Sequence, residues 1–143
     1  MHLTKKAAAT MLMAGACVAG TSGAAFATPE RAELPGVVST EAGGVPVATA
    51  AAGSLCVYQA RDYTSGRYCL STGDGDLRDN RYHVGTASVN DTVSSFVNRT
   101  GYVVEFCNVV NFGTPCVYVP PMSQSPDLGD WDNRFSSIRF HPA

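Results

Sequence analysis

The chain has 143 residues, of which 45% are hydrophobic and 15% are charged, and its formal net charge at pH 7 is −2. From residue 54 onward it holds nine acidic residues, seven arginines and no lysine. This balance offers no basic surface of the kind that nucleic-acid binding requires, so we exclude that class of function.

The first 27 residues have the parts of a secretory signal peptide. The basic start MHLTKK precedes fourteen mostly small or apolar residues, Ala7 to Gly20, and then the small-x-small cleavage site Ala25-Phe26-Ala27. The apolar run is shorter than the about 20 residues that span a membrane. A lipoprotein signal acylated at Cys17 is the alternative, but alanine stands where that signal has a larger aliphatic residue. We therefore predict a secreted, extracellular protein without membrane attachment after cleavage.

Residues 28–53 differ in composition from the rest of the chain. They contain no aromatic residue, whereas twelve of the thirteen aromatic residues lie between Tyr58 and Phe140. A segment without large side chains buries too little area to offset the entropy that it loses on ordering. We expect residues 28–53 to be a flexible leader or propeptide and residues 54–143 to form one folded domain.

Four cysteines remain after signal cleavage, an even number in an oxidising compartment: Cys56, Cys69, Cys107 and Cys116. Zinc is the alternative, but the spacings C-x12-C and C-x8-C are wider than those of zinc ligands. Two disulfides are expected, and four cysteines allow three connectivities. Because Cys56 and Cys69, and likewise Cys107 and Cys116, lie on successive predicted strands, we favour these two pairs.

The domain is predicted to be all-β. Short runs rich in Val, Tyr, Phe and Cys alternate with clusters of Gly, Asp, Asn and Pro, and no window has the apolar spacing of a helix. The predicted strands are LCVYQ, RYCLS, SSFVN, YVVEFC, PCVYV and SSIRF.

The two halves of the domain repeat each other in order. Each half has an aromatic residue that opens a glycine-containing turn, a cysteine in the next strand, an Asp-Leu-x-Asp segment and a six-residue motif. The equivalent positions are Tyr63 and Phe112, Cys69 and Cys116, residues 76–79 and 127–130, and NDTVSS at 90–95 and DNRFSS at 132–137. We expect two four-stranded units, about 54–99 and 100–143, that pair as a sandwich around one core.

The repeated motif [Asn/Asp]-[Asn/Asp]-x-x-[Ser/Thr]-Ser, with an aromatic-plus-glycine turn upstream, resembles the βγ-crystallin domain of two Greek-key motifs. The signal peptide, the four cysteines and the phrases VSSFVNRTG and DLGDWDNRFSSIRF resemble the secreted actinobacterial metalloproteinase-inhibitor family, which shares that fold. The resemblance covers residues 54–143 and implies a monomeric inhibitor of an extracellular metallopeptidase. The turn signature departs from the pattern, because Gly66 falls one place late and Thr114 replaces the second glycine.

The resemblance also implies calcium, which takes six to eight oxygen ligands. In calcium-binding βγ-crystallins, the fifth-position hydroxyl of one motif completes the site of the other. Applied to this chain, that rule gives two sets of candidate ligands, Asn90, Asp91 and Ser136 in one and Asp132, Asn133 and Ser94 in the other. The alternative is that these side chains only cap turns, which is the role that we expect for Ser95 and Ser137.

Nothing in the domain indicates an enzyme. Its only histidines are His83 and His141, and it has neither a nucleophile-elbow sequence nor a metal-ligating histidine pair. The leading hypothesis is a secreted peptidase inhibitor that calcium stabilises. The alternative is a calcium-binding extracellular structural or stress protein without inhibitory activity, and a toxin-like binding module has no specific support.

The first unit has about nine more residues before its motif than the second, since eleven positions separate Asp79 from Asn90 but two separate Asp130 from Asp132. Insertions in a compact β-domain are exposed, and exposed loops carry binding residues. We predict that the loop at 80–89 contacts the protease. Its candidate residues are Arg81, Tyr82, His83 and Val84, and the competing segment is PPMSQSP at 120–126.

Overall fold

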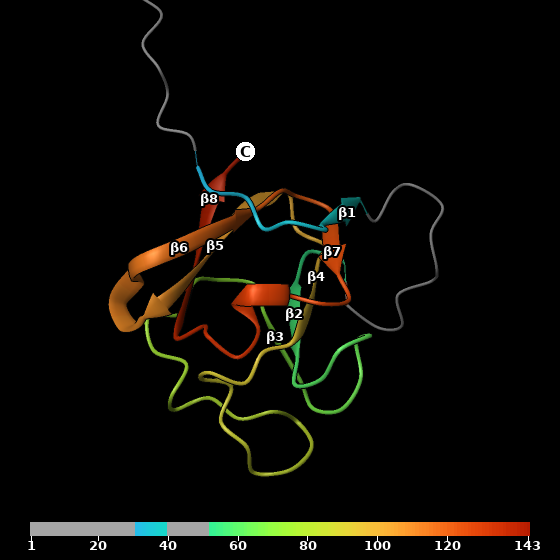
Figure 1. The fold of residues 1–143 in the computed structure, drawn as a ribbon, viewed down its shortest axis with the longest axis vertical. Coiled ribbons are helices and arrows are strands. Elements are labelled where there is room, and N and C mark those ends of the chain that lie inside the picture. The colour runs from blue at the N-terminus through green and yellow to red at the C-terminus, as the bar shows by residue number, and fades with distance from the viewer. Residues whose placement is uncertain (1–30, 40–51) are drawn as a thin grey trace, which may run out of the picture.

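The structure is a computed structural model that describes residues 31–39 and 52–143. The predicted signal peptide and residues 28–30 and 40–51 lie outside the described residues. The described chain is all-β, as predicted, and contains no helix long and apolar enough to cross a membrane. Its elements are β1 (Val38–Ser39), β2 (Leu55–Tyr58), β3 (Arg67–Leu70), β4 (Ser95–Asn98), β5 (Tyr102–Val109), η1 (Val110–Phe112), β6 (Gly113–Val119), β7 (Ser123–Ser125), η2 (Gly129–Trp131) and β8 (Ser137–Pro142) (Figure 1).

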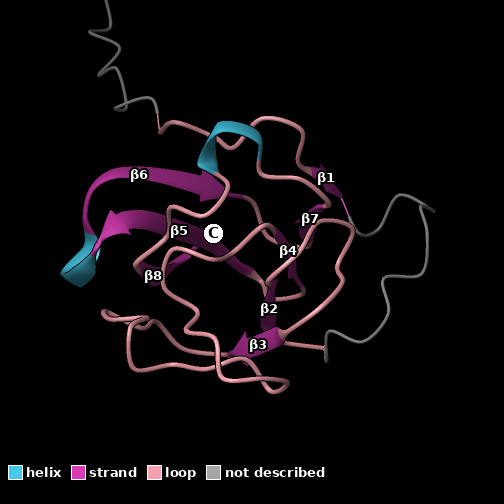
Figure 2. Cartoon of the chain, turned by 60° about the horizontal axis from the view of Figure 1, so that its bottom comes forward, coloured by secondary structure: helices cyan, strands magenta, loops and turns pink. Residues whose placement is uncertain are grey.

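Two antiparallel sheets form the sandwich, with strand orders β1-β7-β4-β2-β3 and β6-β5-β8 (Figure 2). The units exchange strand positions between these sheets. β7 belongs to the second unit but pairs with β4 of the first, and Asp74 of the first unit pairs with Ile138 in β8. This exchange makes each sheet a product of both sequence halves and confirms the predicted pair of Greek-key motifs.

The core lies between the sheets. Phe96 of β4 and Phe106 of β5 are fully buried, and their ring centroids are 5.5 Å apart. Phe135, just before β8, stacks on Phe106 at 4.6 Å. Leu77 and Leu128, which the repeat aligns, are 0% and 1% exposed. The equivalence of the two Asp-Leu-x-Asp segments therefore reflects equivalent core positions.

Both disulfides are local to one unit. Cys56 on β2 is bonded to its register partner Cys69 on β3, and Cys107 on β5 is bonded to its register partner Cys116 on β6. The favoured connectivity is confirmed.

Non-glycine residues supply the left-handed backbone of the hairpin turns. Tyr63 has φ 59° in the first turn and Phe112 has φ 64° in the second. Gly66 is absent from the left-handed region but allows a close approach, since a Cβ there would lie 2.6 Å from Tyr82 Cβ. Both hairpin turns therefore contain a left-handed residue, although neither of these residues is a glycine.

Residues 31–39 pack on the domain. Leu34 is 3% exposed and belongs to the main core, Glu33 pairs with Tyr118, and β1 pairs with β7. These contacts differ from the flexible leader that we expected over residues 28–53. Composition predicted a flexible leader because residues 28–53 lack aromatic residues, whereas residues 31–39 are ordered by contacts with distant strands. Its removal as a propeptide stays a prediction.

Candidate functional site

The two six-residue motifs, residues 90–95 and 132–137, lie side by side and exchange backbone hydrogen bonds. The N–H of Asp91 donates to the carbonyl of Phe135, and the N–H of Asn133 donates to the carbonyl of Val93, both at 2.9 Å. Asp91 and Asn133 have left-handed backbones with φ 54° and 58°, which Asx residues adopt more readily than most. The sequence repeat is therefore also a repeat of backbone geometry.

The fifth-position hydroxyls cross between the motifs. Ser136 Oγ lies 3.2 Å from Asp91 Oδ1, and Ser94 Oγ lies 3.4 Å from Asn133 Oδ1. Each serine is 6% exposed and donates to the oxygen that it approaches. The structure thus brings together the six candidate ligands in the two crossed sets that the resemblance implied.

The first position of each motif has an unsatisfied acceptor. Within the part of the chain that the structure describes, Asn90 Oδ1 and Asp132 Oδ1 are buried without a hydrogen-bond partner. Buried polar atoms normally have partners, and leaving one unpaired is costly. An unpaired carboxylate or amide oxygen beside other oxygen donors fits the ligand preference of calcium. The donor set of both motifs therefore suits this ion.

The last serine of each motif supports a hairpin turn. Ser95 Oγ accepts the N–H of Tyr63 at 3.1 Å, and Ser137 Oγ accepts the N–H of Phe112 at 3.0 Å. Both hydroxyls also donate to a carbonyl of the same turn at 2.7 Å. Ser95 and Ser137 are turn caps, as expected, and they connect each motif to the aromatic turn of its own unit.

The prediction that Tyr82 contacts the protease is wrong. Its side chain is 3% exposed and packs in the main core, and burial raises the pKa of Tyr82 to about 12. The ring turns inward because Gly66, which lacks a side chain, leaves room for it. Thr92 Oγ1 lies 3.2 Å from the Tyr82 hydroxyl and holds its polar end.

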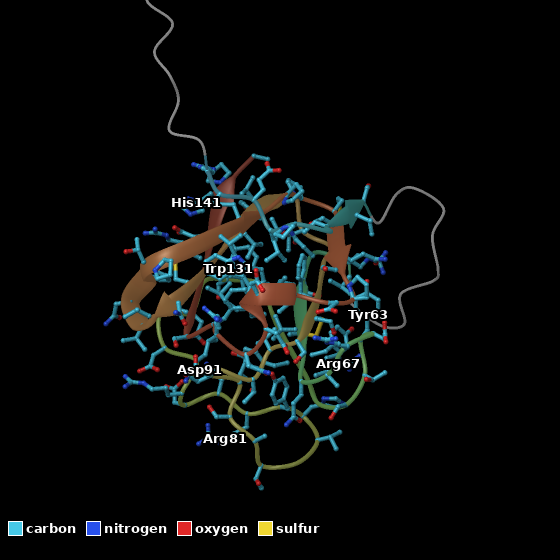
Figure 3. All side chains as sticks on the ribbon, viewed as in Figure 1. Tyr63, Arg67, Arg81, Asp91, Trp131 and His141 are labelled. Atoms are coloured by element: carbon cyan, nitrogen blue, oxygen red, sulfur yellow. A yellow bond between two sulfur atoms is a disulfide. The ribbon has the colours of Figure 1, made fainter. Side chains whose placement is uncertain are left out.

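The other residues of the 80–89 loop differ in availability. Arg81 Nη1 donates to the carbonyls of Arg78 and Asn80 at 2.6 and 2.8 Å. His83 Nδ1 accepts the N–H of Arg67 at 3.0 Å. Val84 is 61% exposed. This loop lies at the end of the molecule opposite His141 (Figure 3). Val84 is the large apolar side chain that the loop exposes to a partner.

The competing segment at 120–126 is not an exposed loop. Its centre is β7, whose residues Ser123, Gln124 and Ser125 are all buried. The Ser123 hydroxyl donates to Pro120 O and the Ser125 hydroxyl donates to Asp127 O, both at 2.6 Å. These bonds allow polar residues to lie inside the sandwich, so the segment presents little surface to a partner.

The β5-η1-β6 hairpin is an exposed segment that sequence reasoning missed. It is closed by Cys107–Cys116, and Val109 at its tip is 46% exposed. The N–H of Asn111 donates to Gly75 O at 2.7 Å, which ties the tip to the first unit. The sequence did contain a signal, because Val109 and Val110 are consecutive apolar residues between two nearby cysteines.

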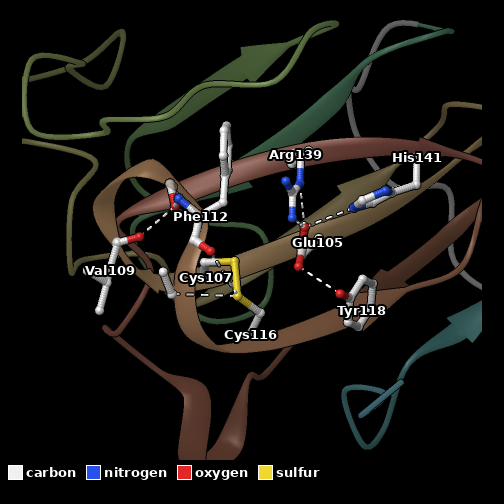
Figure 4. The surroundings of a disulfide bond; sticks show 10 residues. Glu105, Cys107, Val109, Phe112, Cys116, Tyr118, Arg139 and His141 are labelled. Carbon is white, nitrogen blue, oxygen red and sulfur yellow. Dashed lines mark hydrogen bonds and ion pairs between the residues drawn. A yellow bond between two sulfur atoms is a disulfide. The ribbon is translucent and has the colours of Figure 1, made fainter. Parts of the chain in front are cut away.

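A cluster of charged and polar side chains lies on the outward face of the three-stranded sheet to which this hairpin belongs (Figure 4). Glu105 Oε2 lies 2.7 Å from Arg139 Nη2 and 2.9 Å from His141 Nε2, and Tyr118 donates its hydroxyl to Glu105 Oε1 at 2.7 Å. Among the described residues, one group of three His, Cys, Asp or Glu side chains lies close enough together to hold a metal ion. It consists of Glu105, Cys107 and Cys116. Because these cysteines are bonded to each other, the group offers no thiolate to a metal.

Comparison with known proteins identifies the family. The model of peptidase inhibitor family I36 matches residues 46–119. The chain belongs to this family. Membership in an inhibitor family makes it a non-enzymatic protein whose partner is a peptidase. A search among curated proteins found no significant match.

Solved structures show the βγ-crystallin fold. A structure titled "Evolution of the eye lens beta-gamma-crystallin domain fold" is 20% identical, with a TM-score of 0.57 over 70% of this chain and 95% of that one. A βγ-crystallin from Ciona intestinalis is 22% identical, with a TM-score of 0.53 over 62% and 100%. A βγ-crystallin domain from Flavobacterium johnsoniae is 30% identical, with a TM-score of 0.51 over 62% and 93%. This I36 inhibitor therefore has a βγ-crystallin scaffold.

Proposed function

We propose that this I36 inhibitor acts outside the cell on a metallopeptidase and contacts it through the β5-η1-β6 hairpin. The metallopeptidase class rests on the resemblance of residues 54–143 to secreted metalloproteinase inhibitors, and the location rests on the signal peptide that the sequence predicts. The observation that supports the contact is Val109, an exposed apolar residue on a hairpin closed by Cys107–Cys116.

Several contacts hold the hairpin in one conformation. It is held by a disulfide, by the Ser137 bond to Phe112 and by the Asn111 bond to Gly75. A segment held in one conformation loses less entropy on association, so more of its contact energy appears as affinity. The 80–89 loop is also hydrogen-bonded, but Tyr82 is buried there and Val84 is its exposed large apolar side chain.

The first experiment tests the target class. The purified secreted protein is titrated into a thermolysin-like metallopeptidase and, in parallel, into a subtilisin-like serine peptidase, and residual hydrolysis is measured. We expect saturable inhibition of the metallopeptidase alone. Inhibition of the serine peptidase alone would contradict the proposed class, and inhibition of neither would contradict the proposed function.

Two matched variants test the contact. Val109→Asp places a carboxylate where the hairpin would meet the peptidase, and Val84→Asp makes the same change on the other loop. We expect Val109→Asp to raise the inhibition constant at least tenfold, about 1.4 kcal/mol, and Val84→Asp to change it less than threefold. Both side chains are exposed, so the melting temperatures should stay close to that of the parent. The reverse ranking would return the contact to residues 80–89.

We also propose that the crossed motifs bind calcium and that the ion stabilises the fold. The supporting observation is the pair of buried, unpaired oxygens, Asn90 Oδ1 and Asp132 Oδ1, at equivalent positions. Each motif contributes one carboxylate, Asp91 or Asp132, which favours a modest affinity. A ligand that binds the folded state alone raises stability as its concentration exceeds the dissociation constant.

Thermal unfolding with millimolar calcium or with chelator measures this stabilisation. We expect calcium to raise the melting temperature of the parent, and the double variant Asp91→Ala with Asp132→Ala to lose the increment. The control is Asp130→Ala, which removes a carboxylate from an exposed position two residues from Asp132 and should keep the increment. An equal melting temperature of the parent in both buffers would assign the motifs to turn capping alone.

A further inference from the structure

Residues 31–39, which we call the N-terminal strap, connect the edges of the two sheets. In Figure 1 the strap runs from beside β6 to β7, where it ends as β1. β6 is the outer strand of its sheet, and β7 would be the outer strand of the other sheet if β1 were absent. The strap therefore covers one edge of each sheet, and edge strands present backbone groups ready to pair with another extended chain.

Backbone hydrogen bonds hold the first half of the strap to β6. The N–H of Leu34 donates to the carbonyl of Tyr118 at 3.1 Å, and the N–H of Tyr118 donates to the carbonyl of Ala32 at 2.9 Å. Arg31 adds a side-chain contact, with its guanidinium carbon 5.0 Å from the centre of the Tyr118 ring. A cation over an aromatic ring at this distance is attractive.

A turn directs the second half of the strap to β7. Gly36, which follows Pro35, has φ 79°, a conformation that glycine adopts without the strain of a side chain. Val38 then pairs with Gln124 and Ser39 with Ser123, antiparallel to β7. One short extended segment with a single bend thus pairs with Tyr118 on one edge and with Gln124 and Ser123 on the other.

Leu34 is the anchor of the strap. It is 3% exposed and lies in the same core cluster as Val119 and Phe96, whereas Val38 in the same segment is 51% exposed. Burial of a leucine side chain removes apolar surface from water and so favours the packed position. Main-chain pairing along a sheet edge with one side chain in an apolar position is the usual way in which a sheet binds an extended peptide.

We propose that the edges of β6 and β7, with the core position that Leu34 fills, form a binding site for an extended peptide with a leucine anchor. The strap is the ligand of this site in the intact chain. Covalent attachment through residues 40–51 keeps it at high local concentration, so a cut in that connection would turn it into a separate, exchangeable peptide. This inference is independent of peptidase inhibition.

The experiment uses the full chain, folded and purified, with a recognition sequence for a site-specific protease placed at residues 43–48. After cleavage, an isotopically heavy peptide of residues 28–40 is added in excess, and native mass spectrometry follows its uptake. We expect the heavy peptide to replace the cut strap. A Leu34→Asp peptide should bind at least tenfold more weakly, and the matched Val38→Asp peptide should bind within threefold of the parent peptide.

A second measurement distinguishes slow exchange of the strap from the absence of a binding site. If no heavy peptide enters, gel filtration shows whether the cut strap remains on the domain. Retention in the parent and in Val38→Asp, with loss from a Leu34→Asp chain that still melts cooperatively, would support the site. Loss of the parent strap without uptake of the heavy peptide would overturn the proposal, as would equal retention in the Leu34→Asp and Val38→Asp chains, or equal binding of all three peptides.

Discussion

Glu105 lies on the outward face of a three-stranded sheet, yet its side chain is 4% exposed because its neighbours cover it. Tyr118 and Arg139 are its register partners on the two flanking strands. Burial by itself would raise the pKa of Glu105, but hydrogen bonds from Tyr118, His141 and Arg139 outweigh burial and hold the pKa below its ordinary value of 4.5. The carboxylate is therefore stabilised in its charged form in the folded state.

The lowered pKa predicts a pH-dependent contribution to stability. A carboxyl group with a lower pKa in the folded state stabilises the fold fully above the unfolded value of 4.5, and this contribution is lost as the pH falls through the folded value. We expect Glu105→Gln to lower the free energy of unfolding at pH 7 by about 1 to 3 kcal/mol. The difference from the parent should shrink as the pH falls below 4.5, as measured by urea unfolding.

Asp76→Asn is the control for that prediction. The bond to Arg78 lowers the pKa of Asp76 to about 2, but both side chains are well exposed. Exposed ion pairs contribute little to stability because solvent screens them. The control should therefore change stability much less than Glu105→Gln at pH 7. An equal loss in the two variants, or a Glu105→Gln difference that stays constant down to acid pH, would contradict the role of the buried carboxylate.

The strands of the domain were predictable where consecutive residues carry β-branched, aromatic or cysteine side chains. LCVYQ contains β2 and YVVEFC lies within β5, for example. β7 was missed because Ser-Gln-Ser lacks apolar residues, and its burial depends on hydrogen bonds to Pro120 and Asp127 carbonyls that the linear sequence does not show. The strap was missed for a related reason, since Leu34 has its partners on distant strands.

The candidate site was predictable to the extent that it is repeated. The crossed sets of Asx and serine residues followed from two copies of one motif and from the resemblance. Tyr82 could not be placed in this way, because an aromatic residue in a long loop turns inward only if the loop finds an opening in the domain. Gly66 provides that opening, sixteen positions earlier in the chain. Loop residues outside a repeat therefore need the three-dimensional structure before they are assigned to a contact.

At the scale of the whole molecule, each disulfide lies within one half and neither joins the halves. The halves are held together by the shared core, by the exchange of β7 and Asp74, and by the crossed motifs. The two disulfides therefore have parallel structural roles in the two sheets. If the hairpin contacts the peptidase, however, Cys107–Cys116 has an additional role that Cys56–Cys69 lacks.

Removing the disulfides one at a time separates these roles. The bonded cysteines are 13 and 9 positions apart, so loop-closure entropy predicts that replacing either pair with alanine costs about 3 kcal/mol. The two losses should add because the pairs lie in different sheets. Urea unfolding measures these costs.

At conditions where both variants are fully folded, we expect Cys107→Ala with Cys116→Ala to weaken inhibition at least tenfold, because the hairpin is no longer held for binding. Cys56→Ala with Cys69→Ala should inhibit like the parent. Equal inhibition by the two variants would show that bracing of the hairpin is not needed for the contact.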